Sequence, residues 1–237
     1  AGPLAARIEI RDPRFYRHLV FGGSLGAAEA YIRGYWTCDD LVGLIRIFCR
    51  NAAATNGLEG GPARLFSPLA RIAHWLRRNT PSGSRRNIAA HYDLGNEFFA
   101  LFLDETMAYS CAVFPQAAST LYEASLAKFD RVCRKLALTA DDHVLEIGSG
   151  WGGFAVYAAG QYGCRVTTTT ISRKQYEYTS QRVAAAGLAD RVTVLYEDYR
   201  VLKGSFDKLV SIEMIEAVGH QYFDTFFRVC SERLKPH

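Results

Sequence analysis

The stretch Val144-Leu-Glu-Ile-Gly-Ser-Gly-Trp-Gly-Gly153 decides the fold of this chain. Its apolar start predicts a short buried strand, and Gly148 and Gly150 let the backbone turn sharply and approach a ligand with no Cβ in the way. Residues 151–161 carry a helical apolar pattern, so the loop opens onto a helix N-terminus, where free N–H groups favour a negative group. A strand, a glycine-rich turn and a helix in this order are typical of a nucleotide-cofactor site in an open α/β sheet.

The spacing of these glycines distinguishes between cofactors. A dinucleotide-binding fold requires G-x-G-x-x-G and an acid after the second strand. Here the glycines follow G-x-G-x-G, Glu146 precedes the first of them, and the second predicted strand, residues 164–170, ends in threonines without an acid. A carboxylate beside the loop suits the ammonium group or the sulfonium charge of S-adenosylmethionine. The pattern therefore favours S-adenosylmethionine over NAD, and the alternative is a strand-turn-helix unit without a ligand.

Composition is that of a soluble globular protein. The chain has 237 residues, 49% of them hydrophobic and 22% charged, and its net charge of +4 is too small to indicate nucleic-acid binding. No apolar run reaches the roughly 20 residues that cross a bilayer, and we expect no signal peptide. The six cysteines are scattered, without C-x-x-C or zinc spacing, which indicates reduced thiols in a cytosolic protein and no metal site.

An arginine-rich stretch at residues 77–86, interleaved with proline, glycine and serine, divides the chain. It is interpreted as a solvated linker or as a patch that contacts anionic lipid headgroups. We expect a mostly helical region at 1–80, which offers a surface for lipid contact or homodimer formation. A helical lid and substrate-binding segment at 81–140 and an α/β domain at 141–237 follow. The expected location is the cytoplasm, peripherally at the inner face of the membrane.

Apolar periodicity predicts helices before residue 140. They span residues 26–33, 39–54, 63–78, 86–91, 96–103 and 120–138. Thr37 or Asp39 is expected to cap the second of them. After residue 141, strands and helices alternate, which predicts a doubly wound parallel sheet with helices on both faces. The strands are expected at 144–147, 164–170, 191–196 and 206–212, and the helices at 151–161, 173–185 and 221–234.

The two ends of the chain suggest a fragment. Four predicted strands are few for a doubly wound sheet, and residues 233–237 are typical of a helix end that precedes a further strand. The chain also begins without methionine. We therefore expect an α/β domain that is truncated at its C-terminal side.

Five ordered motifs carry a resemblance to a known family. They are His91–Phe99, Tyr109–Cys111, Leu145–Gly153, Thr170–Ser172 and Glu213–Gly219. In these motifs, and in Gly22–Gly26 and Glu29–Trp36 before them, the chain resembles the cyclopropane-fatty-acyl-phospholipid synthases and the related mycolic acid methyltransferases. The resemblance implies the Rossmann-like fold of S-adenosylmethionine-dependent methyltransferases.

The resemblance also implies a reaction. The methyl group of S-adenosylmethionine moves to a cis double bond of an unsaturated phospholipid acyl chain, a carbocation forms, and loss of a proton closes a cyclopropane ring. Aromatic faces stabilise a cation without reacting with it. Aromatic side chains of this kind cluster at Tyr92, Phe98, Phe99, Phe102, Tyr109 and Phe114. Core packing is the alternative role for the three middle phenylalanines.

Bicarbonate is the proton acceptor that the resemblance implies. In the family, the backbone near the Ser-Cys motif and a glutamate hold this bicarbonate, and by position these residues are Cys111 and Glu216 in this chain. The family's later His and Tyr would lie beyond His237. Glu213 is a rival carboxylate. A nucleophilic thiol is the alternative role of Cys111, although no histidine is evidently paired with it. Many relatives have histidine where this chain has Ala217, which is consistent with a subgroup of altered product.

Family position and local chemistry together give a cofactor-binding set. Its members are Tyr109, Ser110, Glu146, Gly148, Gly150, Thr170, Ile171, Gln175, Asp198 and Tyr199. The members up to Gly150 are expected at the amino-acid end, and Thr170, Ile171 and Gln175 at the ribose. Asp198 and Tyr199 are expected at the adenine, whose amino group a carboxylate accepts. For Asp198, a simple turn is the alternative.

Three other functions compete with cyclopropane formation. The same fold serves small-molecule N- or O-methyltransferases, but the helical N-terminal region and the arginine-rich stretch favour a lipid substrate. A methyl-branched or methylene-bearing lipid is an alternative product. A non-catalytic lipid-binding protein would need neither the glycine-rich loop nor Glu216.

Overall fold

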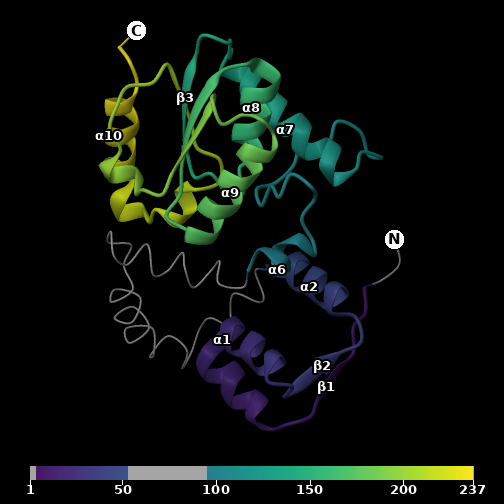
Figure 1. The fold of residues 1–237 in the computed structure, drawn as a ribbon. Coiled ribbons are helices and arrows are strands. Elements are labelled where there is room, and N and C mark those ends of the chain that lie inside the picture. The colour runs from purple at the N-terminus through teal and green to yellow at the C-terminus, as the bar shows by residue number, and fades with distance from the viewer. Residues whose placement is uncertain (1–3, 53–94, 237) are drawn as a thin grey trace. The chain divides into compact units, whose positions relative to one another are not determined.

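The computed structural model describes residues 4–52 and 95–236 (Figure 1). The chain forms two compact units, residues 1–77 and 78–237, which are considered separately below. The described residues do not include the helices predicted at 63–78 and 86–91, the arginine-rich stretch, His91 or Tyr92. Within the described ranges, no helix has the length and apolar character required to cross a membrane.

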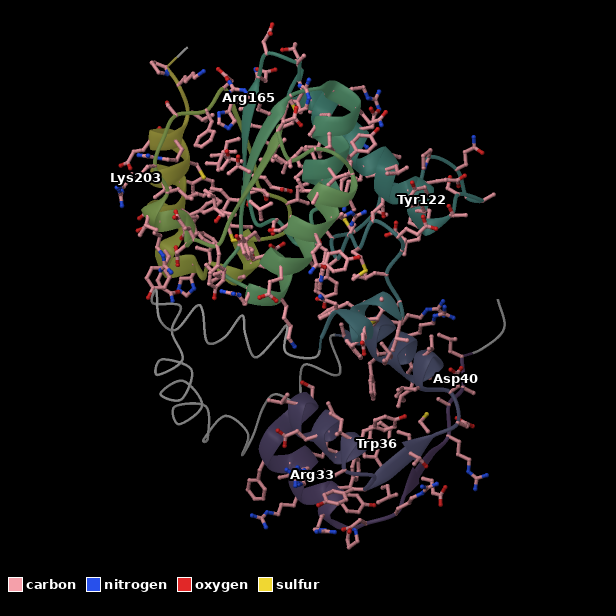
Figure 2. All side chains as sticks on the ribbon, in the orientation of Figure 1. Arg33, Trp36, Asp40, Tyr122, Arg165 and Lys203 are labelled. Atoms are coloured by element: carbon pink, nitrogen blue, oxygen red, sulfur yellow. The ribbon has the colours of Figure 1, made fainter. Side chains whose placement is uncertain are left out.

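The described part of the first unit, residues 4–52, combines two helices with a two-stranded antiparallel sheet. Its elements are β1 (Ile8–Ile10), α1 (Arg14–Ile32), β2 (Trp36–Cys38) and α2 (Leu41–Arg50), and β1 pairs with β2. The two strands were not predicted, because three-residue strands are too short to show alternation. Trp36 is buried against Ala30 and Leu44, and its indole N–H donates to the carbonyl of Ala27 at 2.9 Å (Figure 2). This one aromatic side chain therefore holds β2 against both helices.

Both helices of this unit differ from their prediction. α1 begins earlier than residue 26 and breaks at Gly23, whose φ of 57° is open to glycine at little cost. A Cβ at Gly26 would collide with the carbonyl oxygen of His18, so glycine allows the two halves of α1 to approach. The cap of α2 is Asp40, which accepts from the N–H of Gly43 at 2.8 Å. Asp39, one of the two expected caps, instead accepts from the N–H of Arg7 at 2.7 Å.

The second unit is built around a four-stranded parallel sheet. The strands are β3 (His143–Ile147), β4 (Arg165–Thr169), β5 (Val192–Leu195) and β6 (Lys208–Val210), in the order β5-β4-β3-β6. The helices are α6 (Asn96–Ala100), α7 (Leu121–Lys135), α8 (Gly153–Tyr162), α9 (Arg173–Ala185) and α10 (Phe223–Arg233). Three short 3₁₀ turns are η2 (Tyr199–Val201), η3 (Ile215–Ala217) and η4 (His220–Tyr222). Helices α7, α8 and α9 cover one face of the sheet and α10 the other, which confirms the predicted double winding (Figure 1).

Alternating residues of β3 build two cores, one on each face of the sheet. Val144 packs with Phe154 and Val166 in the core under α8, whereas Leu145 and Ile147 belong to the core under α10. Both faces are covered, so a central parallel strand is apolar on both sides. Glu146 is the exception in β3, because it is a buried carboxyl group.

The elements predicted between residues 95 and 236 are present, and most are shorter than predicted, although α9 has the predicted bounds and β3 begins one residue earlier. The α8 helix begins at Gly153 rather than residue 151, because Gly150 and Gly152 have positive φ and cannot belong to a right-handed helix. The helix predicted at 120–138 is α7, which Thr120 and Glu123 begin with a reciprocal capping box. After α10, the chain returns beside β6 and Leu234 forms a parallel bridge with Phe206.

The order of the strands sets the place of a ligand site. The chain leaves β3 through α8 toward β4 and β5 on one side, while β6 lies on the other side of β3. In open α/β sheets, ligands bind outside the carboxyl ends of the strands where the order reverses. In this unit that point lies between β3 and β6, directly above the glycine-rich loop.

Candidate active site

A cavity of about 680 Å³ opens at the carboxyl ends of the strands. The ends of β3 and β4, the segments that follow all four strands, and residues 107–110 line it. All ten residues predicted to bind the cofactor line this cavity, and so does Glu216. The structure thus brings together, around one space, side chains that come from six separate parts of the sequence.

The glycine-rich loop forms one wall. Gly148, Gly150 and Gly152 have φ of 101°, 50° and 81°, a region that side chains disfavour. The N–H groups of Gly148 and Ser149 both donate to the carbonyl of Thr169, at 3.0 and 2.9 Å, which ties the loop to the end of β4. A Cβ at Gly150 would meet no atom within 4 Å, so this glycine faces open space in the wall of the cavity.

Glu146 lies beneath this loop as a buried acid. It is 3% exposed, and its Oε2 accepts from the hydroxyl of Thr168 at 2.6 Å. Burial raises the pKa of the Glu146 carboxyl from 4.5 to about 8, and the Thr168 hydrogen bond opposes that rise. A positively charged group that entered the cavity would favour the ionised form. The ammonium end of S-adenosylmethionine is the positively charged group that the sequence predicts for this position.

Glu146 makes the stability of the ligand-free protein depend on pH. Its folded pKa of about 8 lies above the ordinary value of 4.5, so its stabilising contribution is complete below pH 4.5 and is lost as pH rises through 8. Glu146→Gln mimics the neutral acid and removes this loss. We expect the free energy of unfolding of the variant, relative to that of the wild type, to rise by up to about 4 kcal/mol between pH 5 and pH 8.5. Urea unfolding at both pH values measures the difference, and a difference that does not change with pH would contradict the assignment.

The end of β4 builds a second wall. The hydroxyl of Thr170 donates to Oε1 of Gln175 at 2.8 Å and accepts from the N–H of Ser172 at 3.1 Å. Ser172 in turn caps α9 through the N–H of Gln175. Gln175 is buried and held at the cavity, with Ile171 beside it. These polar groups suit the hydroxyls of a ribose, which is the role that the sequence predicted for them.

Asp198 is engaged within the protein. Its two carboxylate oxygens accept from Nε and Nη2 of Arg200 at 2.8 and 2.6 Å, and Oδ1 also accepts from the N–H of Arg200 at 3.0 Å. The carboxylate therefore begins the η2 turn, which is the alternative that the sequence left open. Asp198 and Tyr199 both line the cavity, so contact with an adenine remains a prediction.

Residues 107–111 cross the mouth of the cavity. Tyr109 is half-exposed, and its ring centroid lies 5.3 Å from that of Phe99 and 6.5 Å from that of Trp151. Phe99 is buried, and its ring centroid lies 4.8 Å from that of Trp151, so its role is core packing, the alternative given above. Arg182 fastens the start of this segment from α9, because Nη1 donates to the carbonyl of Thr106 at 2.7 Å. Of the described members of the predicted aromatic cluster, Tyr109 lines the cavity and Phe99 belongs to the core. The other three, Phe98, Phe102 and Phe114, are exposed and do not line the cavity.

Of the two catalytic candidates, one lines the cavity and the other does not. Glu216 lines the cavity from the η3 turn, whereas Cys111 does not line it. The N–H of Cys111 donates to Oε1 of Glu213 at 2.9 Å, so the rival carboxylate, not Glu216, is the one in contact with this backbone. A hydrogen bond with Glu213 also raises the pKa of the Cys111 thiol, which disfavours a thiolate nucleophile.

Several residues at or around the site were missed from the sequence. Arg200 and Met214 line the cavity, and Thr168 and Arg182 support it. Lys128 could have been identified from the sequence, because its charged side chain falls on the apolar face of the amphipathic helix predicted at 120–138. Thr168 and Arg182 gave no local signal, because their roles depend on contacts with Glu146 and Thr106 in distant segments.

Known proteins match the chain over most of its length. The family model described as mycolic acid cyclopropane synthetase matches residues 80–237. The cyclopropane-fatty-acyl-phospholipid synthase of Escherichia coli strain K12 is 40% identical over 237 residues, covering 99% of this chain and 59% of that protein. The tuberculostearic acid methyltransferase UfaA1 of Mycobacterium tuberculosis is 37% identical over 259 residues, covering 100% of this chain and 56% of that protein. The chain therefore spans less than two thirds of the length of these curated relatives.

A solved structure agrees with the fold. The mycolic acid cyclopropane synthase CmaA1, complexed with SAH and CTAB, gives a TM-score of 0.62 at 36% identity, covering 64% of this chain and 53% of that one. The predicted Rossmann-like methyltransferase fold is thereby confirmed. On its sequence, its fold and the geometry of its cavity, the chain belongs to the mycolic acid cyclopropane synthetase family.

Proposed function

We propose that this chain binds S-adenosylmethionine and belongs to an enzyme that adds its one-carbon group to a cis double bond of a phospholipid acyl chain, forming a cyclopropane. One observation carries the cofactor part: the ten residues predicted to bind it line a single cavity at the switch point of the sheet. The names of the relatives support the lipid part, since the Escherichia coli protein is a cyclopropane-fatty-acyl-phospholipid synthase.

The residues of the cavity fit the cofactor in charge and shape. Glu146 and the glycine-rich loop would receive the amino-acid end, and Thr170 and Gln175 the ribose. The cofactor, when bound, supplies an electrophilic methyl group. The loop backbone can approach such a ligand closely because Gly148 and Gly150 carry no Cβ.

The remaining walls suit a reaction that must exclude water. An alkene is a weak nucleophile, so the protein must hold it against the methyl group. Attack through the double bond leaves positive charge on the acyl chain, which water would capture in a wet site. Met107, Phe129, Trp151 and Phe154 give the cavity apolar lining, and Tyr109 presents an aromatic face that stabilises a cation.

Loss of a proton from the added carbon closes the ring. We assign Glu216 to hold the proton acceptor, for which bicarbonate is the candidate by family resemblance. The backbone N–H of Cys111 would be a second donor to that anion. In the structure this N–H is satisfied by Glu213, so an anion at Cys111 would compete with that carboxylate.

The substrate implies contact with a lipid surface. We propose peripheral, cytoplasmic association with anionic membranes through the arginine-rich stretch at 77–86, four of whose residues are basic. Co-sedimentation with anionic vesicles should then weaken as salt rises, because salt screens exposed charges. Binding that is equal at low and high salt would contradict this contact.

A methyl-branched lipid is the second candidate product. The relative named tuberculostearic acid methyltransferase is 37% identical to this chain, almost as similar as the synthase at 40%. Both products begin with the same methyl transfer and differ in the fate of the cation. The chemistry after the transfer therefore separates the two candidates.

Lipid analysis tests the proposed function. The protein is produced in a host whose phospholipids contain cis-unsaturated chains, and mass spectrometry detects acyl chains that are heavier by one CH2 unit. NMR then shows whether a cyclopropane ring is present, and a host that produces Gly148→Val is the matched control. A ring supports the first candidate, and an added methyl group without a ring supports the second. Unchanged lipids, with the cofactor still bound, would overturn the lipid substrate.

A further inference from the structure

The segment Tyr109–Cys111 is held from two sides by charged groups that do not belong to it. It supplies Tyr109 and Ser110 to the cavity and has no helix or strand of its own. A segment without regular structure owes its position to side-chain contacts. The two strongest contacts come from Lys128 on α7 and from Glu213 after β6.

Lys128 is a buried ammonium group with a specific target. It is 6% exposed, and its Nζ donates to Oγ of Ser110 at 2.5 Å and to the carbonyl of Ser110 at 3.3 Å. A buried ammonium is costly unless it is hydrogen-bonded and faces negative charge. Burial lowers the pKa of Lys128, and the negative charges of Glu213 and Asp104 oppose this. Lys128 does not line the cavity, so it acts there through Ser110.

Glu213 holds the other end of the segment. Its Oε1 accepts from the N–H of Cys111 at 2.9 Å, although the two residues lie 102 positions apart. The φ of Glu213 is +48°, a conformation that residues other than glycine, asparagine and aspartate seldom adopt. Strain of this kind persists where the surrounding structure requires it, and it is concentrated at functional sites.

We propose that Lys128 and Glu213 are positioning residues that clamp Tyr109–Cys111, so that Tyr109 and Ser110 stand at the amino-acid end of the cofactor. The inference rests on the proposed function, because it assigns the clamp to that cofactor. Lys128 fixes the segment through Ser110 from inside the fold, and Glu213 fixes it through the Cys111 backbone from the end of β6. Neither residue reacts with the substrate in this role.

The clamp predicts that two substitutions weaken binding without weakening the fold. Lys128→Met removes the desolvation cost of a buried ammonium group, which offsets the loss of its two hydrogen bonds to Ser110, and it keeps an unbranched side chain. Glu213→Gly removes the carboxylate and relieves the positive φ. A residue with only a structural role would lose stability and affinity together. Substitution of a clamp residue should lower the affinity for the cofactor without lowering the stability of the fold.

The test compares S-adenosylhomocysteine affinity, thermal midpoint and hydrogen–deuterium exchange in the two variants. We expect Lys128→Met to bind at least about 10-fold more weakly and Glu213→Gly about 5-fold more weakly, with midpoints no lower than that of the wild type. Peptides that cover residues 105–113 should exchange faster in both. Lys135→Met, an exposed change at the end of the same helix, is the control and should match the wild type. Lys128→Arg keeps the charge and should recover part of the affinity.

The double variant sharpens the test. Since both residues hold one segment, Lys128→Met combined with Glu213→Gly should lose less affinity than the product of the single losses. Unchanged exchange of residues 105–113 in Lys128→Met would overturn the clamp, and so would wild-type affinity. If the unaltered protein does not bind S-adenosylhomocysteine, the proposed function fails instead, and the exchange data alone decide whether the segment is clamped.

Discussion

We expect Gly148→Val to lower the affinity for S-adenosylhomocysteine by at least about 100-fold, or about 2.7 kcal/mol. The φ of Gly148 is +101°, which a β-branched residue cannot adopt without strain. A Cβ there would lie 3.2 Å from Cγ and 3.3 Å from Cβ of Met214, tighter than ordinary contact. The rest of the valine side chain would enter the wall of the cavity that the loop backbone forms. Isothermal titration calorimetry measures the affinity.

The control for Gly148→Val must share its backbone strain. Gly187 also has a positive φ, of 66°, and follows α9 away from the cavity, where a Cβ would meet nothing within 4 Å. Gly187→Val should therefore destabilise the fold while leaving the affinity within about twofold of the wild type. Equal affinity losses in both variants would mean that strain, not the site, explains the result. Unchanged binding in Gly148→Val would remove the glycine-rich loop from the cofactor site.

The second large effect is expected on turnover. Glu216→Gln should leave S-adenosylhomocysteine affinity within about threefold of the wild type and lower kcat by about 100-fold. A loss of this size corresponds to the lower end of the rate enhancement that general acid–base groups supply. The variant keeps the shape of the side chain and replaces the carboxylate, which would accept a charge-assisted hydrogen bond from the O–H of bicarbonate, by a neutral amide. Single-turnover conversion of lipid in vesicles measures the step.

Glu213→Gln is the matched comparison, because it alters the rival carboxylate three residues away. The amide keeps an acceptor oxygen for the N–H of Cys111, so most of the turnover should remain. If Glu213→Gln loses turnover and Glu216→Gln retains it, the role that we assign to Glu216 passes to Glu213. The pair thus decides between two carboxylates that the sequence alone left open.

Local patterns were enough for the α/β unit. The apolar run of β3, the glycine spacing after it and the helical periodicity of α9 are all properties of short stretches, so they can be recognised without knowledge of contacts. In the first unit the same reasoning failed for β1 and β2, which gain stability from pairing with each other and not from an alternating pattern. Asp40 rather than a neighbour caps α2 because Asp39 is engaged by Arg7, a contact between segments.

By itself the sequence determined the parallel order of alternating strands and helices, the glycine-rich turn and the set of residues that surround it. Each of these follows from backbone preferences and from a buried face that must be apolar. Only the tertiary structure decided which charges meet. It brought Glu213 to Cys111 and placed the ammonium of Lys128 against Ser110. The energy of a charge depends on burial and on partners from distant parts of the chain, which no local pattern contains.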